Sequence, residues 1–327
     1  MKFREEVRLR RVFLCAALVC FSAASALAVS EGTFQRTLQV TGAVNLEVET
    51  GSGSIQVRTG TSHEVQIVGR VRATTWFGGD AEEKVKRLVA NPPIQQSGNI
   101  IRIGHITDFD LRRNVSISFE LVVPAETTLR AHSGSGSENI DGVRGTVDAE
   151  SGSGSLKISN IDDTVHATTG SGNIEVSTVK GNVRARTGSG SIRATNIAGG
   201  LDGEAGSGNI TLEQTASGAV RAQTGSGGID LRGVRGSLQA KTGSGTIEAE
   251  GNPTGAWTAE TGSGSVRLKF PTEVSFDLHA HTGSGSILIN APLTVQGEIS
   301  KKDVRGKVRS GGVPVEVETG SGSIRIE

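Results

Sequence analysis

The sequence predicts an all-β fold, a parallel β-solenoid or β-helix-like repeat of about 18 residues per coil, with one short capping helix near residues 80–90. Three observations lead to this prediction: a recurring Gly-Ser-Gly motif, short stretches of alternating apolar and polar residues, and an almost purely aliphatic set of apolar residues. The motif occurs eleven times among 327 residues. It starts at Gly51, Gly134, Gly152, Gly170, Gly188, Gly206, Gly225, Gly243, Gly262, Gly283 and Gly320.

The spacing of the motif is nearly constant. From Gly134 to Gly283 successive starts are 18, 18, 18, 18, 19, 18, 19 and 21 residues apart. A fixed period of this size is typical of architectures in which one unit stacks on the next. The copies at Gly51 and Gly320 stand apart, the latter 37 residues after Gly283, which is about two periods. We therefore expect successive coils to stack in chain order.

Two short alternating stretches flank the motif. Alternation places the apolar side chains on one face of a strand. After the motif the expected inward pair is, for example, Leu156 and Ile158, and before it Val147 and Ala149. Because such residues are mostly Ile, Val, Leu or Ala, the interior is expected to be narrow, as in a thin coil. The handedness and the number of faces per coil stay open.

Charges at the outward positions favour parallel coils in register. One column, stacked at the repeat period, contains Glu150, Thr168, Arg186, Glu204, Gln223, Lys241, Glu260 and His281, and a second contains Lys157, Glu175, Arg193, Thr211, Asp230, Glu248, Arg267 and Leu288. Like charges are almost never neighbours in them, as expected for strands about 4.8 Å apart. The alternative is an antiparallel meander, which would leave one long sheet with an uncovered apolar face.

The motif itself predicts the corner between strands. We expect its glycines to adopt positive φ, where a side chain would be strained. We expect its serines to form hydrogen bonds between adjacent coils; they are Ser135, Ser153, Ser171, Ser189, Ser207, Ser226, Ser244, Ser263 and Ser284. An alternative role for the stack is ice binding through Thr169, Thr187, Thr224, Thr242, Thr261 and Thr282, but these threonines adjoin turn glycines.

Residues 1–28 have the pattern of a signal peptide: a basic start, an apolar run and the cleavage motif Ala26-Leu27-Ala28. The alternative is a retained membrane anchor, but the run is shorter than the roughly 20 apolar residues that cross a bilayer. Both cysteines, Cys15 and Cys20, lie in this segment. The exported chain would therefore contain no disulfide, thiolate metal site or cysteine nucleophile.

Residues 29–130 are expected to form an N-terminal β region with a short helix, continuous with the Gly-Ser-Gly solenoid of residues 131–327. The helix is predicted over residues 80–90, with Asp80 and Glu83 as a capping box and Asn91-Pro92-Pro93 as its end. Its apolar stripe would cover the side or end of the solenoid. Strands are expected at about residues 100–106 and 115–123.

Composition and motifs argue against most enzyme chemistry. Removing the five basic and two acidic residues of the signal from 34 of each leaves 29 basic and 32 acidic residues, so no basic excess favours nucleic acid. We predict no catalytic, cofactor-binding or metal-binding residues and no cofactor. Two arrangements are weaker alternatives: His279 and His281 as a surface metal pair, and Asp230 with Glu248 as a carboxylate pair of a polysaccharide-cleaving β-helix.

The sequence Leu121-Val122-Val123-Pro124-Ala125, with the predicted helix before it and serial Gly-Ser-Gly-Ser-Ile stretches after it, resembles the bacterial putative-adhesin family. This family is a domain of unknown function built of β-strand repeats in cell-envelope proteins, and the resemblance covers nearly the whole chain after the signal. It implies a β-helix-like fold, an envelope location and adhesion, and it carries no catalytic residues.

We therefore expect a non-enzymatic, exported protein of the cell envelope that binds a protein or glycan partner through its solenoid surface. The alternative is a polysaccharide-active enzyme on a β-helix scaffold. Nothing after the repeats resembles an anchor, so the periplasm or secretion is expected, with no membrane span after signal cleavage. Self-association is expected to use terminal coils, because a last coil at residues 323–327 would leave its edge uncovered.

Overall fold

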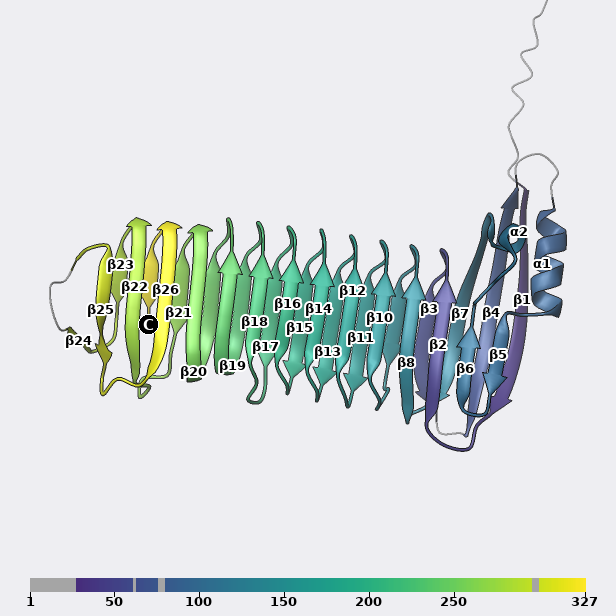
Figure 1. Cartoon of the computed structure of the whole chain (residues 1–327), viewed down its shortest axis with the longest axis horizontal. Helices are drawn as coiled ribbons and strands as arrows, with labels where there is room; N and C mark the ends of the chain where they lie inside the picture. The colour runs from purple at the N-terminus through teal and green to yellow at the C-terminus, as the bar shows by residue number, and fades with distance from the viewer. Residues whose placement is uncertain (1–27, 61–62, 76–79, 296–299) are drawn as a thin grey trace, which may run out of the picture.

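The computed structural model describes residues 28–60, 63–75, 80–295 and 300–327, which form 27 strands and two helices. Figure 1 shows one long stack of strands with helix α1 (Ala81–Ala90) at its N-terminal end. The prediction of an all-β, solenoid-like fold is confirmed. The predicted signal peptide lies outside the described residues except for Ala28, and no described helix is long and apolar enough to cross a membrane.

The strands form two walls that face each other. In spatial order the first wall contains β1 (Ala28–Gln39), β4 (Glu64–Thr75), β7 (Val115–Pro124), β3 (Ile55–Gly60), β9 (Glu138–Asp141), β11 (Leu156–Ile161), β13 (Ile174–Val179), β15 (Ile192–Ile197), β17 (Ile210–Gln214), the first part of β19 (Ile229–Thr242), the first part of β20 (Ile247–Ser263), β21 (Val266–Lys269), β27 (Ile324–Ile326) and β23 (Ile287–Ile289).

The second wall contains the strands that precede the Gly-Ser-Gly corners and, at its two ends, four strands that do not. In spatial order these are β5 (Ile94–Ser97), β6 (Ile100–Ile103), β2 (Val44–Thr50), β8 (Thr127–Ser133), β10 (Val147–Ser151), β12 (Val165–Thr169), β14 (Val183–Thr187), β16 (Leu201–Ala205), β18 (Val220–Thr224), the later parts of β19 and β20, β26 (Val313–Ser321), β22 (Phe276–Ser284), β25 (Asp303–Val308) and β24 (Leu293–Val295).

Neighbouring strands in the middle of both walls are parallel. Val165 lies opposite Val147 on one side and Val183 on the other, and Ile174 lies opposite Leu156 in the first wall. An antiparallel meander is therefore wrong for this region. Antiparallel pairs occur only at the two ends of the described walls, in β1–β4, β4–β7, β5–β6, β22–β25 and β24–β25.

The core lies between the walls and is mostly aliphatic. The inward residues alternate with exposed ones along each strand, and Leu156, Ile158, Val147 and Ala149 are all buried as the alternation predicts. Burial of apolar area stabilises the fold by about 25 cal/mol per Å². Because a coil in a stack buries its inward side chains against the coils above and below it, these neighbours supply most of its stability. The large residue Trp257 is buried near the C-terminal end, where its indole N–H donates to the carbonyl of Gly236 at 2.9 Å.

The prediction of positive φ at the motif glycines is wrong. Among the described residues none of the glycines with positive φ belongs to a Gly-Ser-Gly motif. The reason for glycine is close stacking, because a Cβ on Gly172 would lie less than 3.0 Å from three backbone atoms of Gly154 and Ser155 in the preceding coil. A side chain at this corner would force the coils apart.

The predicted hydrogen-bonding role of the motif serines is also wrong. Ser153 and Ser171 are exposed, whereas the residue just before the motif is buried and bridges two coils. Thr169 is an example: its hydroxyl donates to the carbonyl of Gly154 at 2.9 Å and accepts from the N–H of Gly172 at 3.2 Å. Because these threonines are buried, ice binding through them is excluded.

The other corner of the central coils uses positive φ. Asn160, Thr178 and Asn196 have φ of 57°, 56° and 56°, at the same position in three successive coils. Asparagine tolerates this left-handed conformation, whereas a β-branched threonine is strained in it. The Asn196 amide donates to the Thr178 hydroxyl at 3.2 Å, so the corner side chains also connect one coil to the next.

The N-terminal end is closed by an insertion. The coil formed by β2 and β3 lies directly against the coil formed by β8 and β9, and residues 61–126 between them supply β4 to β7 and both helices. Helix α1 packs on β1 and β4, with Val85 against the backbone at Gly32. The predicted capping box is wrong: the Asp80 side chain makes no cap hydrogen bond and instead pairs with Lys84 at 3.3 Å.

The insertion also contains two predicted strands and a second helix. The predicted strands correspond to β6 and β7, and the short helix α2 (Phe109–Arg112), which the sequence did not reveal, connects them. The Asp108 side chain accepts a hydrogen bond from the N–H of Asp110 at 3.0 Å and so caps that helix. Helix α1 ends at Ala90 before Asn91, as predicted.

The C-terminal end departs from chain order. Strand β26 lies between β20 and β22, and β27 lies between β21 and β23, as the yellow strand between green neighbours shows in Figure 1. Glu260 is therefore opposite Glu318 and not His281, which corrects the end of the predicted outward column. The prediction that residues 323–327 have an uncovered edge is wrong, because β27 is paired on both sides.

Candidate binding face

The outer side of the second wall, here called the second-wall face, contains two continuous rows of outward residues. Each strand of the second wall from β12 to β22 in spatial order contributes one residue to each row, because alternate residues of a strand point the same way. The first row is His166, Arg184, Asp202, Arg221, Gln239, Thr258, Glu316 and His279, with Arg305 of β25 beyond it. The second row is Glu150, Thr168, Arg186, Glu204, Gln223, Lys241, Glu260, Glu318 and His281.

Residues of opposite charge are neighbours at several places in both rows, whereas Glu260 and Glu318 are neighbours of like charge. Arg184 pairs with Asp202 at 3.4 Å, and Lys241 pairs with Glu260 at 2.8 Å. Exposed pairs of this kind add only about 0–1 kcal/mol each to stability. Their main effect is to fix the strand register and to present a face of mixed charge that a complementary partner could read.

Five of the six histidines lie on or beside the second-wall face: His105, His132, His166, His279 and His281. Four of them are close to a carboxylate; for example, His105 lies 3.3 Å from Glu49 and His132 lies 3.7 Å from Glu150. The sixth, His63, precedes β4. This one-sided placement could not be read from the sequence before the walls were known.

A groove of about 670 Å³ crosses the middle of this face. Its floor and walls come from six successive coils, with Arg184, Asp202 and Arg221 along one side. Small residues such as Ala219, just before β18, and Ser237, within β19, leave the space open. The lining contains both charge signs beside apolar residues such as Leu201 and Val220.

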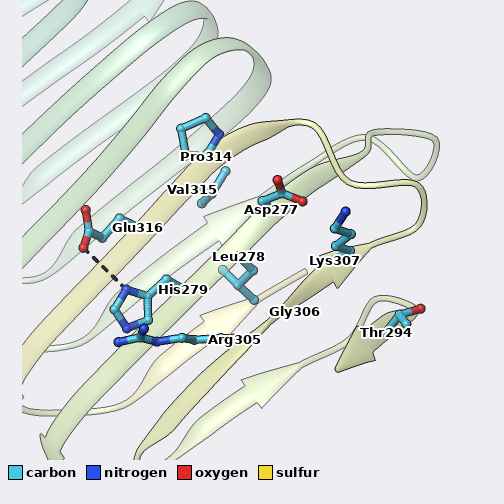
Figure 2. Close-up of a pocket in the computed structure, with 10 residues that line it drawn as sticks. All are labelled: Asp277, Leu278, His279, Thr294, Arg305, Gly306, Lys307, Pro314, Val315 and Glu316. Atoms are coloured by element: carbon cyan, nitrogen blue, oxygen red, sulfur yellow. Dashed lines mark ion pairs between the residues drawn. The ribbon is translucent and has the colours of Figure 1, made fainter. Parts of the chain in front are cut away.

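A second groove, of about 490 Å³, lies at the C-terminal end of the same face over β22, β25 and β26. Figure 2 shows the His279 ring directed at the Glu316 carboxylate, 3.5 Å away. Asp303 lies 3.3 Å from His281 and 3.6 Å from His279. Burial on its own would raise the pKa of Asp303, but the two imidazoles and Arg305 together hold that pKa below its usual value.

In the part of the chain that the structure describes, neither the proposed histidine metal pair nor the proposed carboxylate pair has the surroundings that its chemistry needs. His279 and His281 share the outward side of β22, and within the described residues no group of three or more His, Asp, Glu or Cys side chains is arranged to hold a metal ion. Asp230 and Glu248 are direct neighbours in the first wall. Each is paired with an arginine, Asp230 with Arg232 at 3.1 Å and Glu248 with Arg267, so neither is a free acid or base.

The most unusual titratable residue is Glu138, which sequence reasoning missed. It occupies an inward position of β9, opposite Ile55 and Leu156, and it is only 1% exposed. Neither carboxyl oxygen has a hydrogen-bond partner. Burial, and to a smaller extent the charges of Glu150 and Asp148, raises the pKa of Glu138 to about 8. The available signal was an acidic residue where the other coils have leucine, isoleucine or valine.

Comparison with known proteins agrees with the fold. The family model described as Toastrack DUF4097 matches residues 167–327, from β12 to the C-terminal end of the chain. The resemblance to the putative-adhesin family of unknown function is thereby confirmed. No curated protein matches the chain.

Two solved structures align with most of the chain at low similarity. One is a putative cell adhesion protein from Clostridium sporogenes ATCC 15579, with 12% identity, a TM-score of 0.23, and coverage of 91% of this chain and 99% of that one. The other is a putative adhesin from Bacteroides fragilis NCTC 9343, with 12% identity, a TM-score of 0.31, and coverage of 91% and 98%.

Proposed function

We propose that this chain is a non-enzymatic, exported protein of the cell envelope that binds a protein or glycan partner through the second-wall face. The binding scaffold in this proposal is the parallel solenoid with a coil of about 18 residues. The observation that carries it is the continuity of the first row, whose residues line both the groove of about 670 Å³ and the groove of about 490 Å³. Repeat stacks commonly bind partners along such extended surfaces.

The chemistry of the face favours a charged partner. Arginine, aspartate and histidine occur in the linings of both grooves, and the exposed large apolar residues of the described chain, Val29, Ile100, Phe109 and Leu288, do not line either of them. Neutral sugars are usually held by aromatic stacking, which the grooves lack. An acidic glycan or a charged protein segment fits the alternating arginines and carboxylates better.

The alternative of a polysaccharide-active enzyme needs two carboxyl groups free to act as acid and base or nucleophile. Its best candidate pair, Asp230 and Glu248, is neutralised by Arg232 and Arg267. Incubation of the chain with polymeric glycans, followed by a search for newly released reducing ends, distinguishes the two functions.

The binding proposal is tested by charge reversal. Arg184→Glu and Arg221→Glu change the central groove, while Arg193→Glu, on the exposed side of β15 in the first wall, is the matched control. In pull-downs from envelope fractions and on arrays of acidic glycans, we expect the two groove variants to lose about tenfold in affinity each and the control to be unchanged. Equal binding by all three variants, or no partner in either assay, would contradict the proposal.

A further inference from the structure

The last coil of the chain, residues 313–327, occupies a position between two coils that precede it in sequence. We call this segment the C-terminal coil and its position the slot. Its strand β26 pairs in parallel with β20 and with β22, and its strand β27 pairs with β21 and with β23. The C-terminal coil is therefore an inserted element, added after both sides of the slot have been synthesised.

The two sides of the slot present the same pattern to the C-terminal coil. Val315 lies opposite both Trp257 and Leu278, and Thr319 lies opposite both Thr261 and Thr282. The buried hydroxyls that precede most of the Gly-Ser-Gly motifs connect one coil to the next, and we call this series the hydroxyl ladder. It continues through the slot, where Thr319 donates to the carbonyl of Gly264 and Thr282 donates to the carbonyl of Gly322. The slot therefore binds β26 and β27 through their backbone hydrogen bonds and through the inward pattern Val-x-Val-x-Thr of residues 315–319. The C-terminal coil of any copy of this chain has the same pattern.

Charges on the two sides of the slot differ. Towards β22, Glu316 lies 3.5 Å from His279. On the other side Glu318 lies directly opposite Glu260 and Arg325 lies directly opposite Arg267. Like charges that face each other across a ladder are destabilising, and here Glu260 and Arg267 are also paired with Lys241 and Glu248, which offsets part of the repulsion.

The connection into the C-terminal coil is short and contains unusual backbone. Strands β25 and β26 pair with opposite edges of β22, so residues 309–312 cross the end of that strand. Arg309 and Gly311 in this hinge have φ of 55° and 74°. Arginine is rarely found with positive φ, and a short hinge under strain favours exchange of an element between copies.

We propose that the C-terminal coil exchanges between molecules, so that residues 313–327 of one copy fill the slot of a second copy. The contacts within the slot are the same in the exchanged dimer as in the monomer, so the balance is set by the hinge and by protein concentration. This self-association goes beyond binding of a partner by the second-wall face, and it uses the slot in place of a free edge.

The first test shortens the hinge in the full chain by deleting Ser310 and Gly311. The crossing covers two strand spacings, about 9.6 Å, and the remaining two residues reach only about 10 Å when extended, which leaves no length to pass over β22. We expect light scattering to give twice the monomer mass. Insertion of Gly-Ser-Gly after Gly311 is the control and should leave a monomer. A folded, monomeric shortened chain would overturn the proposal.

The second test detects the exchanged contact directly with the native hinge. One full chain carries Glu260→Cys and another carries Glu318→Cys, both in a background where Cys15 and Cys20 are serine. After the two are refolded together at high concentration, a short thiol cross-linker should join unlike chains, because the two positions are opposite each other in the slot. Glu318→Cys with the remote Ser217→Cys is the control. Should the shortened hinge prevent folding, this mixture decides: cross-linking no greater than the control overturns the proposal.

Discussion

The central coils, residues 127–269, and the C-terminal coils, residues 276–327, are built from the same motif but are ordered differently. In the centre each coil lies on the one before it in sequence. At the C-terminal end the spatial order is residues 247–269, then 313–327, then 276–289. The repeat therefore specifies the register and the inward face of a coil, but it does not specify which coil will be its neighbour.

The ends also differ from the centre in how their edges are closed. Parallel strands end in antiparallel ones at both ends, with β1 and β4 beyond β7, and with β25 and β24 beyond β22. Antiparallel closure breaks the row of unpaired backbone groups that would otherwise continue the stack. A residue in the centre has coils on both sides, whereas β23, the last strand of the first wall in the described structure, pairs with β27 alone.

The largest expected effect comes from a side chain at the tight corner. Gly172→Val in the centre should lose about 5 kcal/mol of unfolding free energy, because its side chain meets backbone that is held by coils on both sides. The equivalent Gly285→Val, in the outermost coil, should lose no more than about half as much, since that coil can shift. Urea unfolding measures both. Equal losses would mean that the centre and the end are equally rigid.

The second effect is a gain in unfolding free energy that depends on pH, from replacing Glu138. This residue puts a carboxyl group at an inward position that is aliphatic in the neighbouring coils. Its folded pKa of about 8 exceeds the unfolded value of 4.5, so the native state keeps a proton that the unfolded chain loses between those two pH values. Stability should therefore fall by about 1.4 kcal/mol per pH unit from pH 4.5 to 8 and then level off. Glu138→Leu should remove this fall and gain up to about 5 kcal/mol at pH 8.

The control for this prediction is Glu138→Gln, which should also remove the pH dependence but gain less, because it keeps a buried polar group. Thermal unfolding of the three proteins between pH 4 and pH 9 measures the effect. A wild-type chain whose stability changes with pH in the same way as that of Glu138→Gln would show that the pKa of Glu138 is not raised in the folded protein.

A smaller effect tests the hydroxyl ladder inside the centre. Thr187 donates to the carbonyl of Gly172 at 2.9 Å and accepts from the N–H of Gly190 at 3.1 Å, whereas the next coil has Ala205 at this position. Thr187→Ala should cost about 2 kcal/mol, and Ala205→Thr should gain about 1 kcal/mol. Urea midpoints at constant m-value provide the comparison, and a loss of stability in Ala205→Thr would show that this coil is packed differently from its neighbours.

The smallest effect concerns the second corner of the central coils. Thr178→Asn should stabilise the chain by about 0.5–1 kcal/mol, because asparagine accepts the φ of 56° and matches Asn160 and Asn196 in the adjacent coils. Thr168→Asn, at an exposed strand position, is the control and should be neutral or slightly destabilising. Differential scanning calorimetry resolves the two changes, and destabilisation by Thr178→Asn would contradict the strain at this corner.

Much of the wall structure could be predicted from the sequence, because alternation and spacing are local properties. The inward burial of residues such as Ile174 and Val176 follows directly from the two-residue period of a strand. The position of the C-terminal coil could not be predicted, since Thr261 is an equally good neighbour for Thr282 and for Thr319. The choice depends on the hinge at residues 309–312 and on the pairing of β25, neither of which has a local signature.

The roles of corner residues and of the binding face were harder to predict. Positive φ and close stacking both require glycine, so the composition of the motif cannot distinguish these two reasons. Composition also does not tell that the hydroxyl of Thr169 points inward and that of Ser171 points outward. The second-wall face joins His166 and His279, which are 113 residues apart, and such a surface exists only once the two walls are formed.

The order of the C-terminal coils is tested most directly by a short-range cross-link within one chain. The double variants Glu260→Cys/Glu318→Cys and Glu260→Cys/His281→Cys place thiols one and two strand spacings apart, about 4.8 Å and 9.6 Å. A cross-linker that spans only the shorter distance should join residues 260 and 318 rapidly and leave 260 and 281 separate. Rapid joining of 260 with 281 would show that the coils stack in chain order and would contradict the inserted coil.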